Sequence, residues 1–185
     1  MNQVQIGTIA DVEIWEMPLF KDNRGSLKKD YVAGKQGSFN REFNIVENFF
    51  TISRKNVFRG LHFQSQPHEL NKIVSIVQGS AIDFLLDLRV ESPTFLNLYV
   101  QPLGNGNEFS IFVPKGVAHG YLSLEENTII SYKFDKPFCQ NCDSGISGEV
   151  IKQFIPIDLS AAIKSEKDMN LSLILGQIPS SICEL

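Results

Sequence analysis

The sequence lacks long apolar runs and lacks an excess of either charge. None of its runs reaches the roughly 20 apolar residues that a membrane-spanning helix needs, so no span is expected. The 17 Lys and Arg against 21 Asp and Glu give a net charge of -4, which excludes nucleic-acid binding across the whole surface. The first 12 residues show neither the basic nor the apolar part of a signal peptide. At this length we expect one globular domain over residues 1–185.

Cysteine is also scarce, with three in 185 residues. An odd, small number is typical of a protein kept in a reducing compartment, so we expect a cytoplasmic location. Cys139 and Cys142 have the spacing of a redox pair or of half a zinc site, while Cys183 stands alone. Structural zinc would require a second such pair or nearby histidines, and a redox motif would open a helix in a βαβ unit. We interpret the pair as a loop with two thiols.

What the sequence does contain is a series of short apolar runs separated by turn residues. Within residues 81–88, Ile82, Phe84, Leu86 and Leu88 fall on one face of an expected strand, and Asp83, Leu85 and Asp87 fall on the other. The other expected strands are 12–17, 43–53, 57–64, 73–77, 94–100, 109–113, 121–124 and 128–134. Many short strands with glycine-bearing turns predict an all-β barrel or sandwich. Residues 160–168 are expected to form a short helix.

Two of the three histidines lie close together in the sequence, beside cationic residues. His62 follows Arg59 within the run 59–64, and His68 and Lys72 come just behind it; the third histidine, His119, lies in 114–120. We expect these segments to meet in the mouth of the barrel and to bind a small anionic substrate. Residues three apart on a strand face opposite sides, so a bend at Gly60 is needed to bring Arg59 and His62 into one pocket.

These residue types fit proton transfer next to a carbonyl group. A neutral histidine can remove a proton, a lysine can stabilise the resulting oxyanion, and an arginine can bind a diphosphate through its forked guanidinium. A histidine base also needs a carboxylate that fixes its tautomer. The sequence leaves four candidates for that carboxylate: Asp83, Asp87, Asp135 and Asp168.

A metal site is the competing interpretation. His62, His68, Glu69 and His119 would supply three imidazoles and a carboxylate, as in metal-dependent small barrels. The absence of a His-x-His pair and the backbone restriction at Pro67 count against it. Taken singly, each histidine or cation is more often structural than functional.

A set of motifs resembles the dTDP-4-dehydrorhamnose 3,5-epimerase family, in the family's order and spacing over about residues 12–168. The motifs are 55–64, Asp87-Leu88-Arg89, 91–95, 113–121, Tyr132-Lys133 and 165–168. The resemblance implies a metal-free cupin-type jelly roll that is a homodimer and uses no cofactor. It also implies inversion of C3 and C5 of a nucleotide-linked 4-keto-6-deoxyhexose, on the way to L-rhamnose and related deoxysugars of surface polysaccharides.

The resemblance further implies catalytic roles. His62 would be the base, Asp168 its orienting partner, Lys72 the residue that stabilises the enolate, and Tyr132 the acid on the opposite face of the sugar. A non-catalytic sugar-nucleotide binder, the alternative from another class, would not need His62, Asp168 and Tyr132 together. A related ketoisomerase is disfavoured because the sequence has no paired His-x-His.

The remaining implied positions concern substrate binding. Arg59 and Arg24 would hold the diphosphate or nucleotide, and Phe138 would stack on the base. His119 and Lys167 would line the pocket. The N-terminal segment with Phe20 and Arg24 would cross into the neighbouring subunit's pocket.

The sequence departs from the family pattern around the substrate. Lys29 stands where the family usually has Glu, Glu47-Asn48-Phe49 replaces a Gln-Asp-Asn run, and Ser147-Gly148-Glu149 replaces a Trp-Asp segment. We keep Lys29 and Glu47 as expected substrate-binding residues. If Lys29 meets the base, it would suit the acceptor N3 of cytosine, so a CDP-sugar substrate is an alternative to dTDP. Epimerisation at C3 alone is a second alternative.

Overall fold

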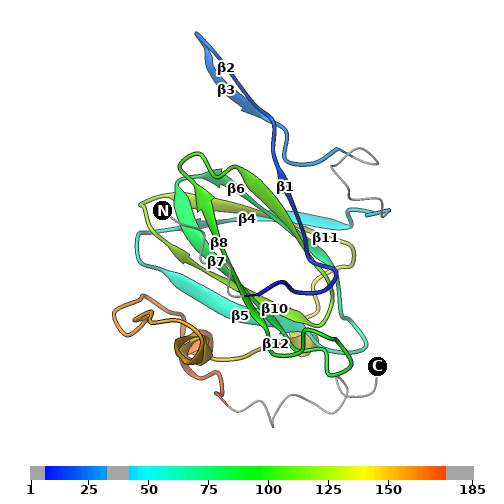
Figure 1. Ribbon diagram of the computed structural model, residues 1–185. Helices are drawn as coiled ribbons and strands as arrows, with labels where there is room; N and C mark the ends of the chain where they lie inside the picture. The colour runs from blue at the N-terminus through cyan, green and yellow to red at the C-terminus, as the bar shows by residue number, and fades with distance from the viewer. Residues whose placement is uncertain (1–6, 33–41, 174–185) are drawn as a thin grey trace.

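The computed structural model describes residues 7–32 and 42–173, in which two five-stranded antiparallel sheets face each other (Figure 1). The first sheet has the order β1 (Glu13–Glu16), β9 (Phe109–Val113), β6 (Lys72–Gln78), β11 (Thr128–Phe134) and β4 (Glu47–Ser53). The second has the order β12 (Asp143–Gly145), β5 (Phe58–Gln64), β10 (Val117–Ser123), β7 (Ser80–Asp87) and β8 (Leu98–Gly104). Strands β4 to β11 pass from one sheet to the other in jelly-roll order, except that β7 and β8 are neighbours in the second sheet. Strands β1 and β12 each extend one sheet. The predicted all-β jelly roll is confirmed.

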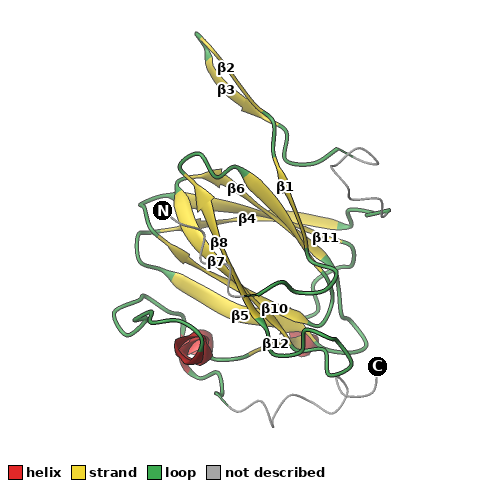
Figure 2. Cartoon of the chain, viewed as in Figure 1, coloured by secondary structure: helices red, strands yellow, loops and turns green. Residues whose placement is uncertain are grey.

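The strand predictions hold with shifted ends, and the helix prediction is largely wrong. Residues 43–46 and 94–97 lie outside the sheets, so the strands expected there begin later, at Glu47 and Leu98. The helix expected over 160–168 is only α1 (Glu166–Met169), which begins where Ser165 caps the backbone N–H of Asp168. Two short 3₁₀ helices, Gln140–Cys142 and Gly148–Gln153, precede it (Figure 2).

The alternation predicted for β7 separates two apolar clusters. Leu85 faces the space between the sheets and packs with buried residues of the facing sheet, such as Val74 and Ile130. Phe84 and Leu86 face outward, where the segment after β12 covers them with Val150, Leu159 and their neighbours. The facing sheet covers one face of β7 and the segment after β12 covers the other, so side chains on both faces of β7 are buried.

The hairpin of β2 (Leu19–Asp22) and β3 (Gly25–Lys28) stands away from the two sheets (Figure 1). Its base is fixed to the barrel, where the Lys28 Nζ donates to the Ile76 carbonyl and pairs with Glu108. Phe20 and Leu27 are more than half exposed on this hairpin. In the part of the chain that is described, no helix is long and apolar enough to cross a membrane.

A bend in β5 at Gly60 shapes the site. His62 pairs with His119 and Arg59 pairs with Tyr121, so β5 uses one more residue than β10 over the same length. Gly60 has a φ of 134°, and a Cβ there would lie 2.5 Å from the Gly120 Cα. Only glycine fits this conformation and this close approach. The bend turns Arg59 and His62 toward the same cavity, as the sequence predicted.

The bend predicts that Gly60→Ala is more destabilising than an alanine at another glycine with positive φ. Gly106 is the matched control, because its φ is 93° and no atom lies within 4 Å of the point where its Cβ would be. Gly106→Ala should lose roughly 1–3 kcal/mol from backbone strain. Gly60→Ala should lose about 1–3 kcal/mol more from overpacking, measured by urea unfolding. Equal losses for the two variants would contradict the role given to the Gly60–Gly120 contact.

Candidate active site

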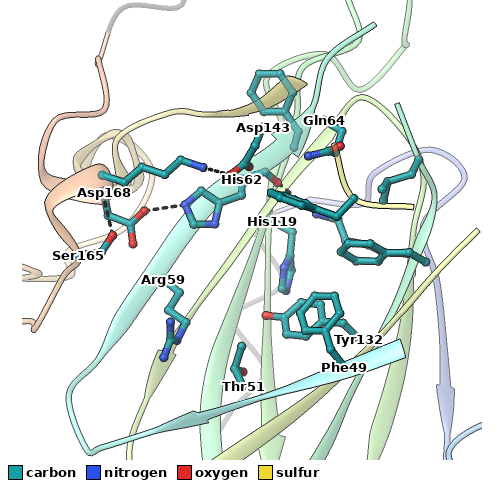
Figure 3. A pocket seen from close by; sticks show the side chains of 16 residues that line it. Phe49, Thr51, Arg59, His62, Gln64, His119, Tyr132, Asp143, Ser165 and Asp168 are labelled. Carbon is teal, nitrogen blue, oxygen red and sulfur yellow. Dashed lines mark hydrogen bonds and ion pairs between the residues drawn. The ribbon is translucent and has the colours of Figure 1, made fainter. Parts of the chain in front are cut away.

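A cavity of about 280 Å³ opens between the two sheets at one end of the barrel (Figure 3). Polar and aromatic side chains from both sheets and from the C-terminal segment line it. They are Phe49, Thr51, Arg59, His62, Phe63, Gln64, Leu70, Lys72, His119, Tyr132, Phe134, Phe138, Asp143, Ser165, Lys167 and Asp168. The cavity therefore gathers most of the side chains that the sequence or the resemblance singled out: Arg59, His62, Lys72, His119, Tyr132, Phe138, Lys167 and Asp168.

His62 and Asp168 form a pair at the wall of this cavity. The His62 Nε2 lies 2.6 Å from the Asp168 Oδ1, and the Asp168 side chain is almost fully buried. Burial favours a higher pKa for Asp168, but the hydrogen bonds from His62 and Ser165 and the nearby cations outweigh it and lower the pKa. An ionised Asp168 fixes one ring nitrogen of His62 as a donor. The other ring nitrogen is then left to accept a proton.

A second histidine–aspartate pair lies deeper. The His119 Nε2 is 2.7 Å from the Asp83 Oδ1, and both side chains are buried. Burial lowers the pKa of His119, although Asp83 acts in the opposite direction. Burial also raises the pKa of Asp83, against the effect of His119 and Lys72. His119 is consequently a neutral donor or acceptor at the floor of the cavity.

Lys72 lies beside both pairs at the start of β6. Its Nζ donates to the carbonyl of His62 at 3.1 Å, and the side chain is buried. Burial lowers the pKa of Lys72 to about 8, while Asp83 and Asp143 favour its charged form. A buried ammonium group at this position can stabilise negative charge that develops on an oxygen in the cavity.

Tyr132 lies on the opposite wall, on β11 of the facing sheet. Its ring stacks on Phe49 at a centroid distance of 5.0 Å and contacts His119 edge-on. In Figure 3 its hydroxyl points into the space that Arg59 and His62 also face. Burial, with Tyr121 and Asp83, raises the pKa of Tyr132 well above its ordinary value. The phenol is protonated at neutral pH and is able to donate a proton.

Arg59 is held in place from behind. Its Nε donates to the Ser53 Oγ at 3.1 Å, and Ser53 in turn bonds the hydroxyl of the buried Tyr121. Thr51 bonds the same hydroxyl at 2.8 Å. The rest of the Arg59 guanidinium faces the cavity, where it can bind an anionic group.

The rim is formed by the segment that follows β11. Glu47 does not line the cavity; its carboxylate accepts from the Phe138 backbone N–H at 2.7 Å and so fixes the position of Phe138. The Phe138 ring is 47% exposed at the mouth, which leaves a face available for stacking. Lys167 pairs with Asp143 across the opening. Glu47 therefore supports the site from outside, in contrast to the direct contact expected for it.

The four carboxylates left open by the sequence have four different partners. Asp168 bonds His62, and Asp83 bonds His119. Asp87 accepts hydrogen bonds from Arg89 and from the hydroxyls of two neighbouring residues, Ser92 and Thr94. Asp135 accepts from Asn71. Of the four, the first two reach the cavity region, and Asp168 is the one that contacts His62.

Three of the expected binding residues lie away from this cavity. Phe20, Arg24 and Lys29 belong to the protruding β2–β3 hairpin and the residue that follows it, where Arg24 pairs with Asp22. Lys29 is exposed beside this hairpin. None of the three lines the cavity of its own chain.

The metal set considered as an alternative is wrong. His62 and His119 are bonded to different aspartates, and Glu69 lies 3.8 Å from Lys115. His68 is on the outside, beside the two cysteines. The four side chains thus do not converge on one point.

Eight cavity residues were not among the site residues expected from the sequence. They are Phe49, Thr51, Phe63, Gln64, Leu70, Phe134, Asp143 and Ser165. The available signal was alternation: Phe49 and Thr51 occupy the same face of the strand expected over 43–53. Ser165 had a second signal, because a serine three residues before an acidic residue is typical of a helix N-cap.

Comparisons with known proteins agree with this architecture. The family model for dTDP-4-dehydrorhamnose 3,5-epimerase matches residues 7–175. The Escherichia coli dTDP-4-dehydrorhamnose 3,5-epimerase is 32% identical over 170 residues, covering 88% of this chain and 89% of the relative. The Salmonella typhimurium enzyme is 33% identical over 142 residues, covering 75% of this chain and 76% of the relative.

Solved structures show the same likeness in three dimensions. The Legionella pneumophila dTDP-6-deoxy-D-glucose-3,5-epimerase, in complex with dTDP-4-keto-L-rhamnose, superposes with a TM-score of 0.85 at 28% identity, covering 98% of this chain and 96% of that one. The Bacillus anthracis epimerase with TDP and PPi bound gives 0.83 at 31% identity, covering 94% and 99%. On the family match and these relatives, the chain belongs to the dTDP-4-dehydrorhamnose 3,5-epimerase family.

Proposed function

We propose that the protein inverts C3 and C5 of a dTDP-linked 4-keto-6-deoxyhexose by proton transfer through an enolate. The observation that carries the proposal is the placement of His62 and Tyr132 on opposite walls of one cavity, on β5 and β11. A sugar ring between them would meet a base on one face and an acid on the other. Inversion at a carbon requires such an arrangement, because the proton leaves one face and returns to the other.

Each step has a residue to perform it. His62, oriented by Asp168, removes the proton from the carbon next to the C4 ketone, and the electron pair moves to the ketone oxygen. Lys72 stabilises the resulting enolate oxygen, and His119 lies beside it at the floor. Tyr132 then donates its proton to the carbon from the opposite face. Repetition at the second carbon completes the reaction, after proton exchange with solvent restores both groups.

Binding groups lie at the rim and behind the catalytic pair. Arg59 would hold the diphosphate, Phe138 would stack on the base, and Lys167 would lie near the sugar. The preference for dTDP is supported by the bound ligand of the Legionella relative, which is similar over 98% of this chain. The expected cytoplasmic location stays a prediction.

We also propose a homodimer in which the β2–β3 hairpin completes the partner's site. Phe20 and Leu27 are exposed on this hairpin, which stands away from the two sheets. The edge strand β4 and the residue before it expose a second apolar row, Val46, Phe50 and Ile52. Pairing of two copies would cover such an edge and bring Arg24 to the neighbouring cavity.

The function is tested with dTDP-4-keto-6-deoxyglucose in D2O, followed by NMR. We expect inversion and deuterium incorporation at both C3 and C5. His62→Ala should lower kcat by roughly 10²–10⁴-fold, because it removes the general base. Binding of dTDP, measured by calorimetry, should stay within about threefold of wild type, since His62 lies at the sugar end of the proposed site.

Three outcomes would contradict parts of this proposal. Near-normal turnover by His62→Ala would exclude His62 as the base. Inversion at C3 alone would replace the double reaction by a single epimerisation. Faster turnover of the matching CDP-sugar than of the dTDP-sugar would reverse the nucleotide assignment.

The hairpin exchange is tested by mixing two inactive or weakened variants. In a mixed dimer of Arg24→Ala and His62→Ala, one pocket has an intact His62 and receives an intact Arg24 from the partner. Random mixing makes half the dimers mixed, each with one native site of two, so about a quarter of wild-type kcat/KM should return.

The matched control mixes His62→Ala with Tyr132→Phe. Both residues lie in the same chain's cavity, so no mixed dimer contains a native site and no activity should return. Absence of recovery in the Arg24→Ala mixture, with mixed dimers present by mass spectrometry, would contradict the exchange.

A further inference from the structure

A cluster outside the catalytic cavity brings together three metal-binding side chains. The ring nitrogen of His68 and the sulfur atoms of Cys139 and Cys142 all lie within 4.8 Å of one another. Tetrahedral zinc with bonds of about 2.3 Å to sulfur separates its ligand atoms by about 3.8 Å. The three side chains are thus close to the spacing of a metal site before any ion is bound.

The two loops that carry these residues are joined by hydrogen bonds of their own. The Gln64 side chain accepts from the Cys139 N–H at 2.9 Å and donates to the Cys139 carbonyl at 3.2 Å. The Ser65 N–H and hydroxyl both donate to the Cys142 carbonyl. The pairing of β12 with β5 continues this connection. The ligand positions are therefore set by the fold, which reduces the ordering that an ion would have to impose.

The local chemistry favours a cation. Both cysteines are free thiols, and Cys142 is buried. Two thiolates side by side repel each other unless a cation lies between them. His68 is exposed, so solvent has access to a fourth coordination position.

We propose that His68, Cys139 and Cys142 bind one Zn²⁺ ion, with water as the fourth ligand. Thiolate and imidazole are the ligands that zinc uses in proteins, and the Cys-x-x-Cys spacing is common among its sites. The sequence showed only the two cysteines, and the third ligand comes from a loop far earlier in the chain. The proposal is an alternative to the interpretation of the pair as a loop with two thiols.

The position of the cluster gives the ion a structural role. Phe138, which precedes Cys139, and Gln64, which bonds it, both line the catalytic cavity. An ion bound to both loops would tie the Phe138 segment to the end of β5. The site lies at the rim and takes no part in proton transfer, so its existence does not depend on the proposed reaction.

Cobalt is the probe for this site, because Co²⁺ replaces zinc and absorbs light. Titration of the reduced, metal-free protein with Co²⁺ should give the charge-transfer band of a cobalt–thiolate bond and the visible bands of tetrahedral Co²⁺. Both should saturate at one ion per chain and disappear when Zn²⁺ is added. Elemental analysis of protein purified under reducing conditions should find one zinc per chain.

Variants locate the ion. Cys139→Ser, Cys142→Ser and His68→Asn should each weaken binding by more than the roughly 10–100-fold expected for loss of a supporting residue. Cys183→Ser, which removes the third cysteine of the sequence, is the matched control and should bind as wild type does. Circular dichroism of each variant checks that the sheets are retained.

Three results would overturn the proposal, and the first two need no variant. One is a wild-type protein that binds neither Co²⁺ nor Zn²⁺ at micromolar concentrations with its thiols reduced. Another is a thiol count showing a Cys139–Cys142 disulfide in protein isolated without oxidant. The third is tight Co²⁺ binding with a cobalt–thiolate charge-transfer band that persists in Cys139→Ser and is lost in Cys183→Ser.

Discussion

The close approach of β5 to β10 at Gly60 is the constraint on which the site depends. A Cβ at Gly60 would lie 2.5 Å from the Gly120 Cα, so two glycines allow the strands to meet where β5 carries one extra residue. In a regular strand without this bulge, Arg59 and His62, three residues apart, would face opposite sides of the sheet. The bend therefore turns an ordinary strand into a wall that offers both a base and an anion-binding group. Its effect is local, because the next pairings in the sheet, β10 with β7 and β7 with β8, keep a regular register.

The jelly roll places a second sheet opposite β5, and this sheet carries the proposed proton donor. Tyr132 on β11 and His62 on β5 belong to different sheets, and the cavity lies between them. Buried groups between the sheets set the electrostatics: Asp83 keeps His119 in place, and burial lowers the pKa of Lys72 to about 8. A jelly roll alone does not determine a reaction, and here the reaction is inferred from these side chains.

The sequence predicts the strands and their faces well, because alternation is a local property. The two faces of β7 and the bend at Gly60 followed from pattern alone. Long-range partners did not: spacing could not select Asp168 over Asp83 for His62, and it could not place His68 beside Cys139. Such contacts are made by loops whose course depends on the whole fold. The sequence predicted the turn of the projecting β2–β3 hairpin, but it did not predict that the hairpin lies away from the cavity.

The central claim is that His62 and Tyr132 act on opposite faces of one sugar ring. The most direct measurement is NMR of the dTDP-4-keto-6-deoxyglucose carbons after incubation with Tyr132→Phe in D2O. Because His62 still removes the proton, the account predicts that deuterium enters at C3 and C5 with the original configuration retained. Inversion by Tyr132→Phe at the wild-type rate would contradict it, since a proton would then reach the opposite face without the phenol.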